Sequence, residues 1–235
     1  MEIMHVDIQE AGYEKDIATI HNVRFSIEPA QLVGMVGANG AGKSTTIKAM
    51  LDQLVYVKGQ IQKDHQMTYS YIPERPVYYD ELTLWEHIEF VAAVEGLGEE
   101  QIDYARDLLK TFRLYKHRHE FPHSFSKGMQ QKGMITLALF SQPQFLIIDE
   151  PFMGLDPSST KILLELLEKE KEKGTAILMC THVLDTAQRV CDSFVVMEKG
   201  TLKAKGTLGE VLETCGATDG SLYSCIDEGE SYDDE

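Results

Sequence analysis

Residues Gly37-Ala38-Asn39-Gly40-Ala41-Gly42-Lys43-Ser44 match the phosphate-binding pattern G-x-x-x-x-G-K-[ST]. The apolar run Leu32–Val36 before them predicts a buried strand, and a helix is expected from residue 43 to about residue 54. Glycines let the backbone N–H groups turn toward phosphate oxygens, and the positive end of the helix dipole strengthens the attraction. We expect Lys43 to reach the β- and γ-phosphates and the Ser44 hydroxyl to ligate Mg²⁺. By itself the loop indicates a nucleoside triphosphate and does not separate a kinase, a GTPase and an ATPase.

The segments on either side of this loop predict an α/β protein. Apolar and polar positions alternate over residues 4–28, as in antiparallel strands, and residues 66–72 predict another strand. Residues 82–140 have helical periods instead. Short apolar runs predict buried parallel strands at 145–148, 176–180 and 194–197, with an amphipathic helix over 158–173. This order predicts a P-loop NTPase core with an N-terminal antiparallel β-subdomain and an inserted α-helical lobe at about 80–140.

Two acids end one of the predicted buried strands. Asp149 and Glu150 follow four apolar residues, and Pro151 comes next. The carboxyl edge of a parallel sheet is where the phosphate loop also lies, so Asp149 is expected to hold Mg²⁺ there. Glu150, one residue later, is expected to polarise the attacking water.

Three further motifs make the chain resemble an ABC ATPase. They are Phe125-Ser126-Lys127-Gly128-Met129-Gln130-Gln131-Lys132, then Gly154-Leu155-Asp156, then Thr181-His182. With the phosphate loop and the Asp149-Glu150 strand they follow the family's order, and the resemblance covers about residues 8–212. Within that family the chain is similar to the ATPase subunits of bacterial Ecs-type transporters, in the ABC-2 exporter group. Residues 71–74, 81–84, 125–129, 181–184 and 191–194 carry this second likeness.

The resemblance implies a role for each motif. Tyr13 would stack on adenine, although a surface or core tyrosine is the alternative at that position, and Gly37 to Ser44 with Thr45 would bind the phosphates. The signature residues Ser126, Lys127, Gly128 and Met129 would contact the ATP held by a second subunit. Asp156 would lie at the dimer seam, His182 would act with Glu150 in catalysis, and Ser44, Glu74 and Asp149 would ligate Mg²⁺.

Two positions depart from the usual family pattern. The usual signature L-S-G-G-Q is Phe125-Ser126-Lys127-Gly128-Met129 in this chain, which keeps the serine and the second glycine and adds a cation. Glu74 stands where the family usually has glutamine, and a carboxylate can ligate Mg²⁺ but cannot donate a hydrogen bond as an amide does.

Composition limits the possible partners. The chain has 235 residues and a formal net charge of −16, which disfavours binding to nucleic acid and to anionic lipid. No apolar stretch is long enough to span a bilayer, and the four cysteines form no CxxC pair. We therefore expect a cytoplasmic protein held at the inner face of the membrane by a membrane-spanning partner.

We expect one ABC ATPase domain over residues 1–214 and an acidic, loosely held tail over 215–235. The predicted activity is hydrolysis of ATP to ADP and phosphate, with ATP and Mg²⁺ as cofactors and a second ATPase subunit as partner, in a homodimer. Membrane subunits would contact the segment 75–84, where Tyr78 and Tyr79 are expected at an interface, with burial in the core as the alternative. Two other functions stay open at this point: a soluble ABC ATPase without a transporter, and a regulatory module that binds ATP without hydrolysing it.

Overall fold

The computed structural model describes residues 2–64 and 66–226, and these residues group into two units. Unit 1 comprises residues 2–64 and 178–226 of this range, and unit 2 comprises residues 66–177. The phosphate loop belongs to unit 1, and the signature motif and the Asp149-Glu150 pair belong to unit 2. Each unit is described in turn.

Unit 1 is built mainly of strands. They are β1 (Met4–Gly12), β2 (Ile20–Ile27), β3 (Leu32–Val36), β4 (Tyr56–Lys63), β8 (Ser193–Glu198) and β9 (Thr201–Gly206). Its helices are α1 (Lys43–Met50), α6 (Leu184–Val190), α7 (Leu208–Cys215) and the short 3₁₀ helix η3 (Leu222–Cys225). Strand β7 (Ala176–Cys180) brings the chain back from unit 2.

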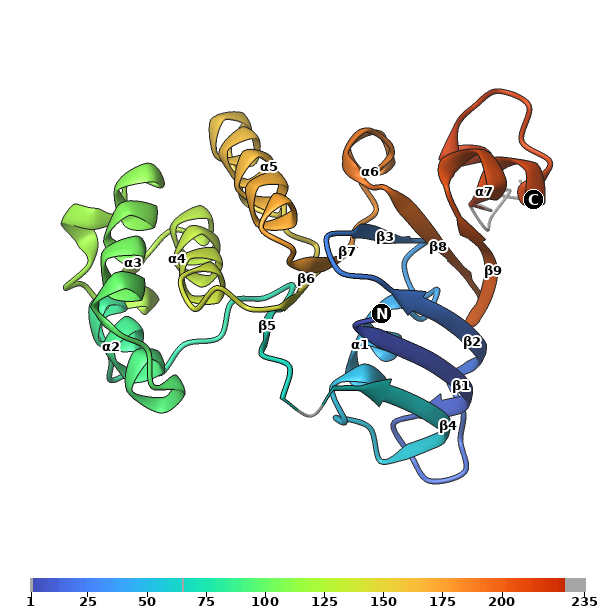
Figure 1. Ribbon diagram of the computed structural model, residues 1–235, viewed down its shortest axis with the longest axis horizontal. Helices are drawn as coiled ribbons and strands as arrows, with labels where there is room; N and C mark the ends of the chain where they lie inside the picture. The colour runs from blue at the N-terminus through green and yellow to red at the C-terminus, as the bar shows by residue number, and fades with distance from the viewer. Residues whose placement is uncertain (1, 65, 227–235) are drawn as a thin grey trace, which may run out of the picture. The chain divides into compact units, whose positions relative to one another are not determined.

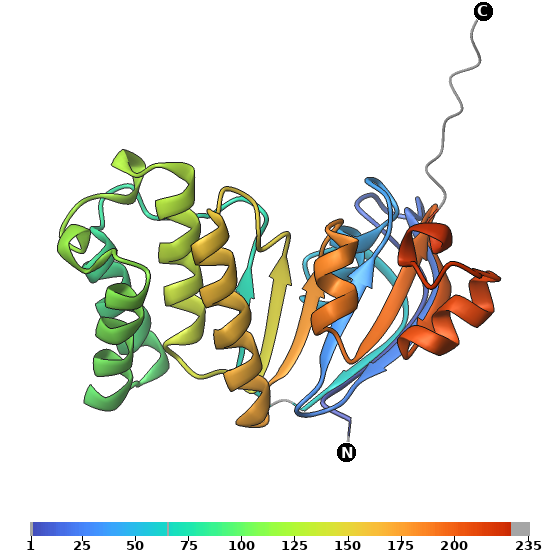
Figure 2. The same cartoon turned by 90° about the horizontal axis from the view of Figure 1, so that it is seen from above.

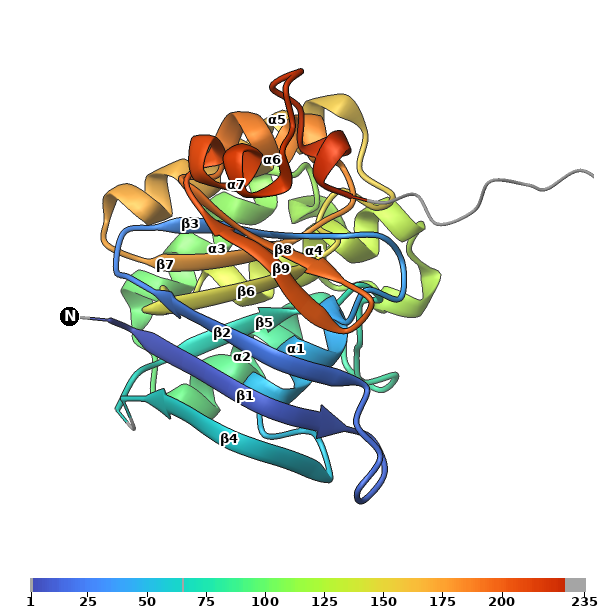
Figure 3. The ribbon, with the colours of Figure 1, turned by 90° about the vertical axis from the view of Figure 1, so that its right-hand side faces the viewer.

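The N-terminal strands of unit 1 form an antiparallel layer. β1 lies between β2 and β4, with Met4 opposite Ile27 on one side and opposite Lys63 on the other, and Figure 3 shows the three side by side. Alternate residues of β1, such as Val6 and Ile8, are fully buried, as expected for a strand with one face on the core. The alternation over residues 4–28 is thereby confirmed as an antiparallel pair.

The rest of the unit 1 sheet continues in the order β2, β9, β8, β3. β3 is parallel to β8, with Met35 opposite Val195, and every residue of β3 is buried. A strand that is buried on both faces needs apolar residues throughout, which explains the uninterrupted run that ends at the phosphate loop. Figure 1 shows α1 starting close to β1 and β2, against which it packs.

Unit 2 is mainly helical. Its elements are β5 (Tyr69–Ile72), α2 (Leu84–Glu95), α3 (Glu99–Thr111), η1 (Tyr115–His117), η2 (Pro122–Ser124), α4 (Lys127–Leu139), β6 (Phe145–Asp149) and α5 (Pro157–Glu172). Helices α2, α3 and α4 pack on one another, and β5 runs parallel to β6 with Ile72 opposite Ile148 (Figure 1). Three of these helices start at side-chain caps, because Thr83, Ser126 and Asp156 each accept a backbone N–H of the first turn.

The structure corrects three of the sequence-based boundaries. Helix α1 ends at Met50, short of residue 54, because Asp52 takes a left-handed conformation and the Gln53 N–H returns to the Lys48 carbonyl. The strand expected over residues 66–72 starts at Tyr69. The tail was expected to be loosely held from residue 215, yet Leu222 and Cys225 are fully buried and η3 packs on α6 and α7. Figure 2 shows α7 beside β9, on which it packs, and residues 227–235 of the expected tail lie outside the described residues.

Candidate functional site

The phosphate loop of unit 1 has the backbone that its glycines make possible. A Cβ atom at Gly37 would lie 2.4 Å from the Met197 carbonyl oxygen, so only glycine fits where β3 meets the loop. Gly42 has φ +104° at the start of α1, and a Cβ there would lie 2.7 Å from the Ile20 side chain. These two positions shape the loop, and the N-terminus of α1 that follows it has the N–H groups and the dipole that suit phosphate oxygens.

The Lys43 side chain is held inside this loop. Its ammonium donates to the carbonyl oxygens of Gly37 at 2.7 Å and Ala38 at 3.1 Å, and the residue is 8% exposed. An ammonium has three donors in a compact charge, so phosphate oxygens can join or replace these carbonyls. The next residues, Ser44 and Thr45, lie in the first turn of α1, where the sequence places the metal and phosphate ligands.

Tyr13 lies beside the same helix. Its hydroxyl is 3.3 Å from Thr45 Oγ1, and the Lys48 ammonium lies 4.9 Å from the centre of its ring. The residue is 47% exposed, which rules out the core alternative. An exposed aromatic ring close to the phosphate loop suits base stacking, and the adenine contact stays a prediction.

His182 follows β7 and reaches the phosphate loop within unit 1. It lines a cavity of about 270 Å³ together with Gly37, Ala38 and Asn39. The Thr181 N–H donates to the Met35 carbonyl of β3 at 3.3 Å, which fixes the end of β7 near the start of the loop. His182 and the start of the phosphate loop therefore line one cavity, and the role of His182 in the nucleotide site stays a prediction.

Two residues of the C-terminal segment complete the same cavity. Tyr223 and Ile226 form part of its wall, and Ile226 also lines a neighbouring cavity of about 180 Å³ with Ala38 to Ala41. Sequence reasoning missed them, because a small, polar and acidic segment gives no apolar period to follow. The sequence signal that could have identified this segment was the pair of apolar residues Leu222 and Cys225, both of which are buried in the structure.

In unit 2, β6 presents two acids at its carboxyl end. Asp149 is 3% exposed and Glu150 is 9% exposed. Glu150 has φ +51°, a left-handed conformation that is uncommon for a residue with a side chain, and its carbonyl accepts the Met153 N–H at 3.3 Å. Buried carboxylates at a strand end suit an ion ligand and a base, as the sequence predicts.

The signature motif forms the start of α4. Ser126 is the N-cap, and its Oγ accepts the Met129 N–H at 3.3 Å. Gly128 packs on the loop after β6 so closely that a Cβ would lie 2.5 Å from the Gly154 carbonyl oxygen. The signature glycine and the Gly154 loop therefore form one packed structure.

Asp156 connects this loop to both α4 and α5. It caps α5 through the Ser159 N–H and Oγ at 2.9 and 2.7 Å, and the Lys132 ammonium of α4 donates to it at 2.9 Å. These hydrogen bonds, from Ser159 first and then Lys132, hold the pKa of Asp156 well below its usual range. Its place at a dimer seam stays a prediction.

A cavity of about 530 Å³ in unit 2 collects several predicted residues. Glu74, Lys127 and Gly154 line it, with Arg75 and Gln131. Gln131 is buried, and its Nε2 has no hydrogen-bond partner within the described part of the chain. A buried donor without an acceptor is costly, so this cavity is suited to an acceptor-rich ligand. Glu74 and Lys127, both predicted as ligand contacts, are thus brought together.

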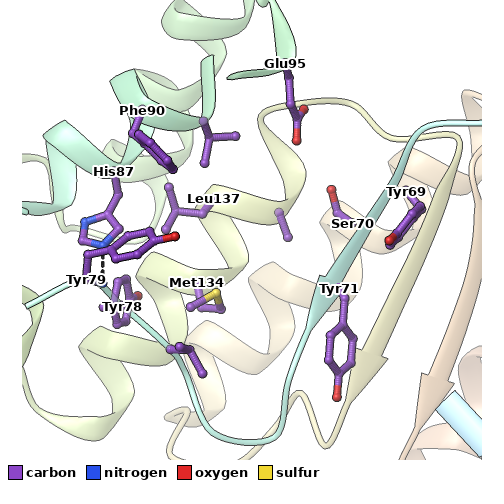
Figure 4. A pocket seen from close by; sticks show the side chains of 13 residues that line it. Tyr69, Ser70, Tyr71, Tyr78, Tyr79, His87, Phe90, Glu95, Met134 and Leu137 are labelled. Carbon is purple, nitrogen blue, oxygen red and sulfur yellow. Dashed lines mark hydrogen bonds between the residues drawn. The ribbon is translucent and has the colours of Figure 1, made fainter. Parts of the chain in front are cut away.

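A second cavity of unit 2, about 500 Å³, is walled by aromatic and aliphatic side chains (Figure 4). Tyr79 stacks on His87 with ring centres 6.0 Å apart, and its N–H donates to His87 Nε2 at 2.9 Å. Tyr79 is 58% exposed, as expected for an interface. Tyr78 is different: its hydroxyl donates to the Gln130 carbonyl at 2.5 Å, and burial raises the pKa of this hydroxyl. Tyr78 is therefore partly packed into the helical lobe, as the core alternative expects, and it also lines this cavity, so its place at an interface stays a prediction.

Within residues 2–64 and 66–226, no helix has the length and apolar character that crossing a membrane requires. The same residues contain no cluster of three or more His, Cys, Asp or Glu side chains placed to hold a metal ion.

Comparisons with known proteins identify the family. A family model described as "ABC transporter" matches residues 20–153. The ABC transporter ATP-binding protein YthP of Bacillus subtilis (strain 168) is 46% identical and aligns over 95% of each chain. EcsA of the same organism, an ABC-type transporter ATP-binding protein, is 42% identical over 94% of each chain. A solved structure of the ATP-binding subunit of an ABC transporter is 40% identical, with a TM-score of 0.88, over 94% of this chain and 96% of that one.

These matches confirm the resemblance drawn from the motifs, including the likeness to Ecs-type subunits, and they confirm the predicted fold class. They also favour the transporter subunit over a soluble ATPase or a module that does not hydrolyse ATP. The chain belongs to the ABC transporter family and is an ATP-binding subunit with ATPase activity.

Proposed function

We propose that this subunit drives a membrane transporter by closing on a second copy around two ATP molecules and opening when they are hydrolysed. Tyr13 and residues 37–45 hold the nucleotide, Glu150 polarises the attacking water, and His182 contacts the γ-phosphate. Ser126, Lys127, Gly128 and Met129 bind the ATP of the second copy, with Asp156 at the seam. One ABC ATPase domain over residues 1–214, with its lobe at about 80–140, carries this cycle.

The signature side of this proposal is supported by the chemistry of the cavity near α4. Lys127 and Arg75 provide two cations, and the buried Gln131 Nε2 provides a donor that lacks an acceptor in the described chain. A triphosphate offers many acceptor oxygens and negative charge, which would satisfy both features. Ser126 at the N-terminus of a 13-residue helix adds its dipole to the attraction.

The residues proposed as metal ligands fit Mg²⁺. Ser44, Glu74 and Asp149 offer a hydroxyl and two carboxylates, which are hard oxygen donors of the kind that Mg²⁺ prefers together with phosphate oxygens and water. Bound Mg²⁺ would neutralise charge that develops on the phosphates during hydrolysis. Glu74 suits ligation rather than amide-like sensing, because a carboxylate has no hydrogen to donate.

The main support for coupling to a membrane subunit is the exposed aromatic cavity of unit 2. Val77, Tyr79 and Phe90 are exposed, although apolar surface of this kind is usually buried or kept for a partner. Figure 4 shows Tyr79 and Phe90 beside each other, and their rings pack edge to face with centres 5.6 Å apart. Such a preformed aromatic wall is typical of grooves that accept an apolar helix face.

The acidic group in this cavity further limits the kind of partner segment that could bind there. Glu95 lines it, and burial raises the pKa of the Glu95 carboxyl above its usual value. A partially desolvated carboxylate is stabilised by an opposite charge, so the partner segment should place a basic residue beside its apolar face. We therefore assign the cavity to a short amphipathic, basic segment of a membrane subunit on the cytoplasmic side.

The test replaces Tyr79 with serine and compares it with Phe121→Ser. Phe121 is an exposed aromatic of the same unit that stacks on His123 outside this cavity, so it controls for loss of surface area. Tyr79→Ser should weaken binding of the membrane subunit by about 2 kcal/mol, or about thirtyfold in the dissociation constant. The measurements are the yield of that membrane protein retained by each variant from detergent-solubilised membranes, and the melting temperature of each variant. Equal retention by both variants would mean that the transporter contacts another surface.

A further inference from the structure

Two cysteines of unit 1 meet where the C-terminal segment returns to α7. Cys215 is the last residue of α7, and Cys225 is the last residue of η3. The Cys225 Sγ lies 3.9 Å from the Val211 carbonyl oxygen. In a regular helix this oxygen accepts the N–H of the residue four positions later, which is Cys215. The Cys225 sulfur therefore lies against the last turn of α7, on which Cys215 is carried.

The two thiols also interact with each other. Burial, followed by the hydrogen bond and the charge of Cys215, raises the pKa of Cys225 to about 12. Cys225 is fully buried, whereas Cys215 is partly exposed. Lys203 and Asp219 are the other charged groups that act on Cys225, with opposite effects. An exposed thiol in contact with a buried one is the arrangement of an attacking and a resolving cysteine.

The segment between the cysteines is held on its other side by α6. Gln188 donates from Nε2 to the Gly220 carbonyl at 2.8 Å, and its Oε1 accepts the Leu222 N–H at 3.3 Å. Asp219 accepts the Ser224 hydroxyl at 2.8 Å, which closes the turn on itself. The segment is therefore a clamp that contacts both α6 and α7.

This clamp leads directly to the nucleotide site of unit 1. Tyr223 and Ile226 share a cavity with His182, Leu184 and the first residues of the phosphate loop. Leu184 begins α6, the helix that Gln188 links to the clamp. A bond that fixes the clamp to α7 would therefore restrain Tyr223 and Ile226, which line the same cavity as the phosphate loop and His182.

We propose that Cys215 and Cys225 form a reversible disulfide that fixes residues 216–226 beside the phosphate loop and slows ATP turnover. The oxidant is a small-molecule disulfide such as oxidised glutathione. The Cys215 thiolate attacks one of its sulfurs, the S–S bond of the reagent breaks, and one glutathione leaves as a thiolate that takes up a proton. The Cys225 sulfur then loses its proton and displaces the second glutathione, so two protein thiols are oxidised and one small disulfide is reduced to two thiols.

The effect on turnover follows from the contacts of the clamp. In the proposed hydrolysis cycle, on which this inference rests, the phosphate loop and His182 both contact the phosphates and exchange these contacts when phosphate is bound and released. A covalent bond at α7 removes freedom from the segment that forms their common wall, so the cycle should slow. The reduced protein keeps the same hydrogen bonds through Gln188 and Asp219 without that constraint.

The experiment treats the full-length chain with oxidised glutathione and counts free thiols under denaturing conditions. The wild type should lose two of its four thiols with a mass decrease of two hydrogens, and should melt at a higher temperature. Its ATP turnover should fall about fivefold or more, the lower end of typical coupling between sites, and should return on reduction with dithiothreitol. Cys215→Ser is the main variant because this partly exposed position tolerates serine, and Cys191→Ser is the matched control at another partly exposed cysteine.

Cys215→Ser should lose both the intramolecular disulfide and the oxidative slowing, while Cys191→Ser should keep both. A wild type that gains one glutathione per chain, or loses no thiols, would overturn the proposal. A disulfide that forms without any change in turnover would overturn the regulatory part. The thiol count and the melting temperature need no ATPase activity, so a failure of the disulfide and a failure of the assigned hydrolysis give different results.

Discussion

Replacement of Glu150 by glutamine tests the assignment of the base. Glutamine has the same size and shape, so the buried position after β6 should stay filled and the melting temperature should change little. What is lost is basicity, and loss of a general base slows a reaction by about 10²–10⁴. This range corresponds to about 2.7–5.4 kcal/mol in the activation free energy. ATP binding should be unchanged, because the amide keeps the shape and the hydrogen-bonding capacity of the carboxyl group.

The left-handed backbone conformation of Glu150 suggests a second variant, Glu150→Gly. A left-handed φ of +51° costs a residue with a side chain, whereas glycine adopts it freely. Glu150→Gly should therefore lose turnover as Glu150→Gln does, yet keep or gain stability, because relief of about 1–3 kcal/mol of strain outweighs the roughly 0.5–1 kcal/mol that the freedom of glycine in the unfolded chain costs. Glu165→Gln, the same chemical change at an exposed position of α5, is the control for both.

The assays are phosphate release under saturating ATP and Mg²⁺, thermal unfolding, and sedimentation with and without nucleotide. Glu150→Gln with ATP should sediment as a dimer, because uncleaved ATP stabilises the closed state. Turnover near the wild-type rate in Glu150→Gln would refute its role as base. Glu150→Gly that is much less stable than the wild type would refute the argument from backbone conformation.

Two further predictions concern the loop and the seam. Gly37→Ala should abolish binding of a fluorescent ATP analogue and retain the fold. The reason is that the alanine Cβ would lie 2.4 Å from the Met197 carbonyl oxygen and displace the loop. Binding at wild-type affinity would contradict this. Asp156→Asn should lower the free energy of unfolding at pH 7, because the pKa of Asp156 is depressed in the folded chain and its carboxylate therefore stabilises the folded state above the unfolded pKa of about 3.9. The difference between wild type and variant should shrink as the pH falls below about 4, as urea unfolding at several pH values would show; a constant difference would mean that the charge is not the cause.

The strands and the phosphate loop could be predicted from sequence because their signals are local. β3 and β7 have the bounds that their apolar runs predict, since a strand buried on both faces cannot contain polar residues. β4 was missed, because its residues are mostly exposed and Gly59 interrupts its pattern. β4 forms because it pairs with the edge of β1. This long-range pairing cannot be predicted from the residues of β4 alone.

The residues of the candidate site also fall into two groups, those with local sequence signals and those placed by long-range packing. Residues whose role depends on backbone curvature or on a strand end, such as Lys43 and Asp149, were predictable from spacing. The partial burial of Tyr78 was not, because its hydroxyl bonds to the Gln130 carbonyl of α4, far along the chain. Tyr223 was not either, because its place beside His182 depends on how η3 packs on α6 and α7.

The unusual backbone positions separate two kinds of functional residue. At Gly37 and Gly42 the close neighbours leave no room for a side chain, and the loop needs only their backbone to follow a phosphate. At Glu150 the backbone is also left-handed, yet the chain keeps a side chain there at a cost of about 1–3 kcal/mol. Glycine would remove that cost, so the presence of glutamate means that its carboxylate is needed where the backbone is least favourable for it. This is the physical reason to expect the chemistry at Glu150 rather than at Asp149, which ends β6 in ordinary strand conformation.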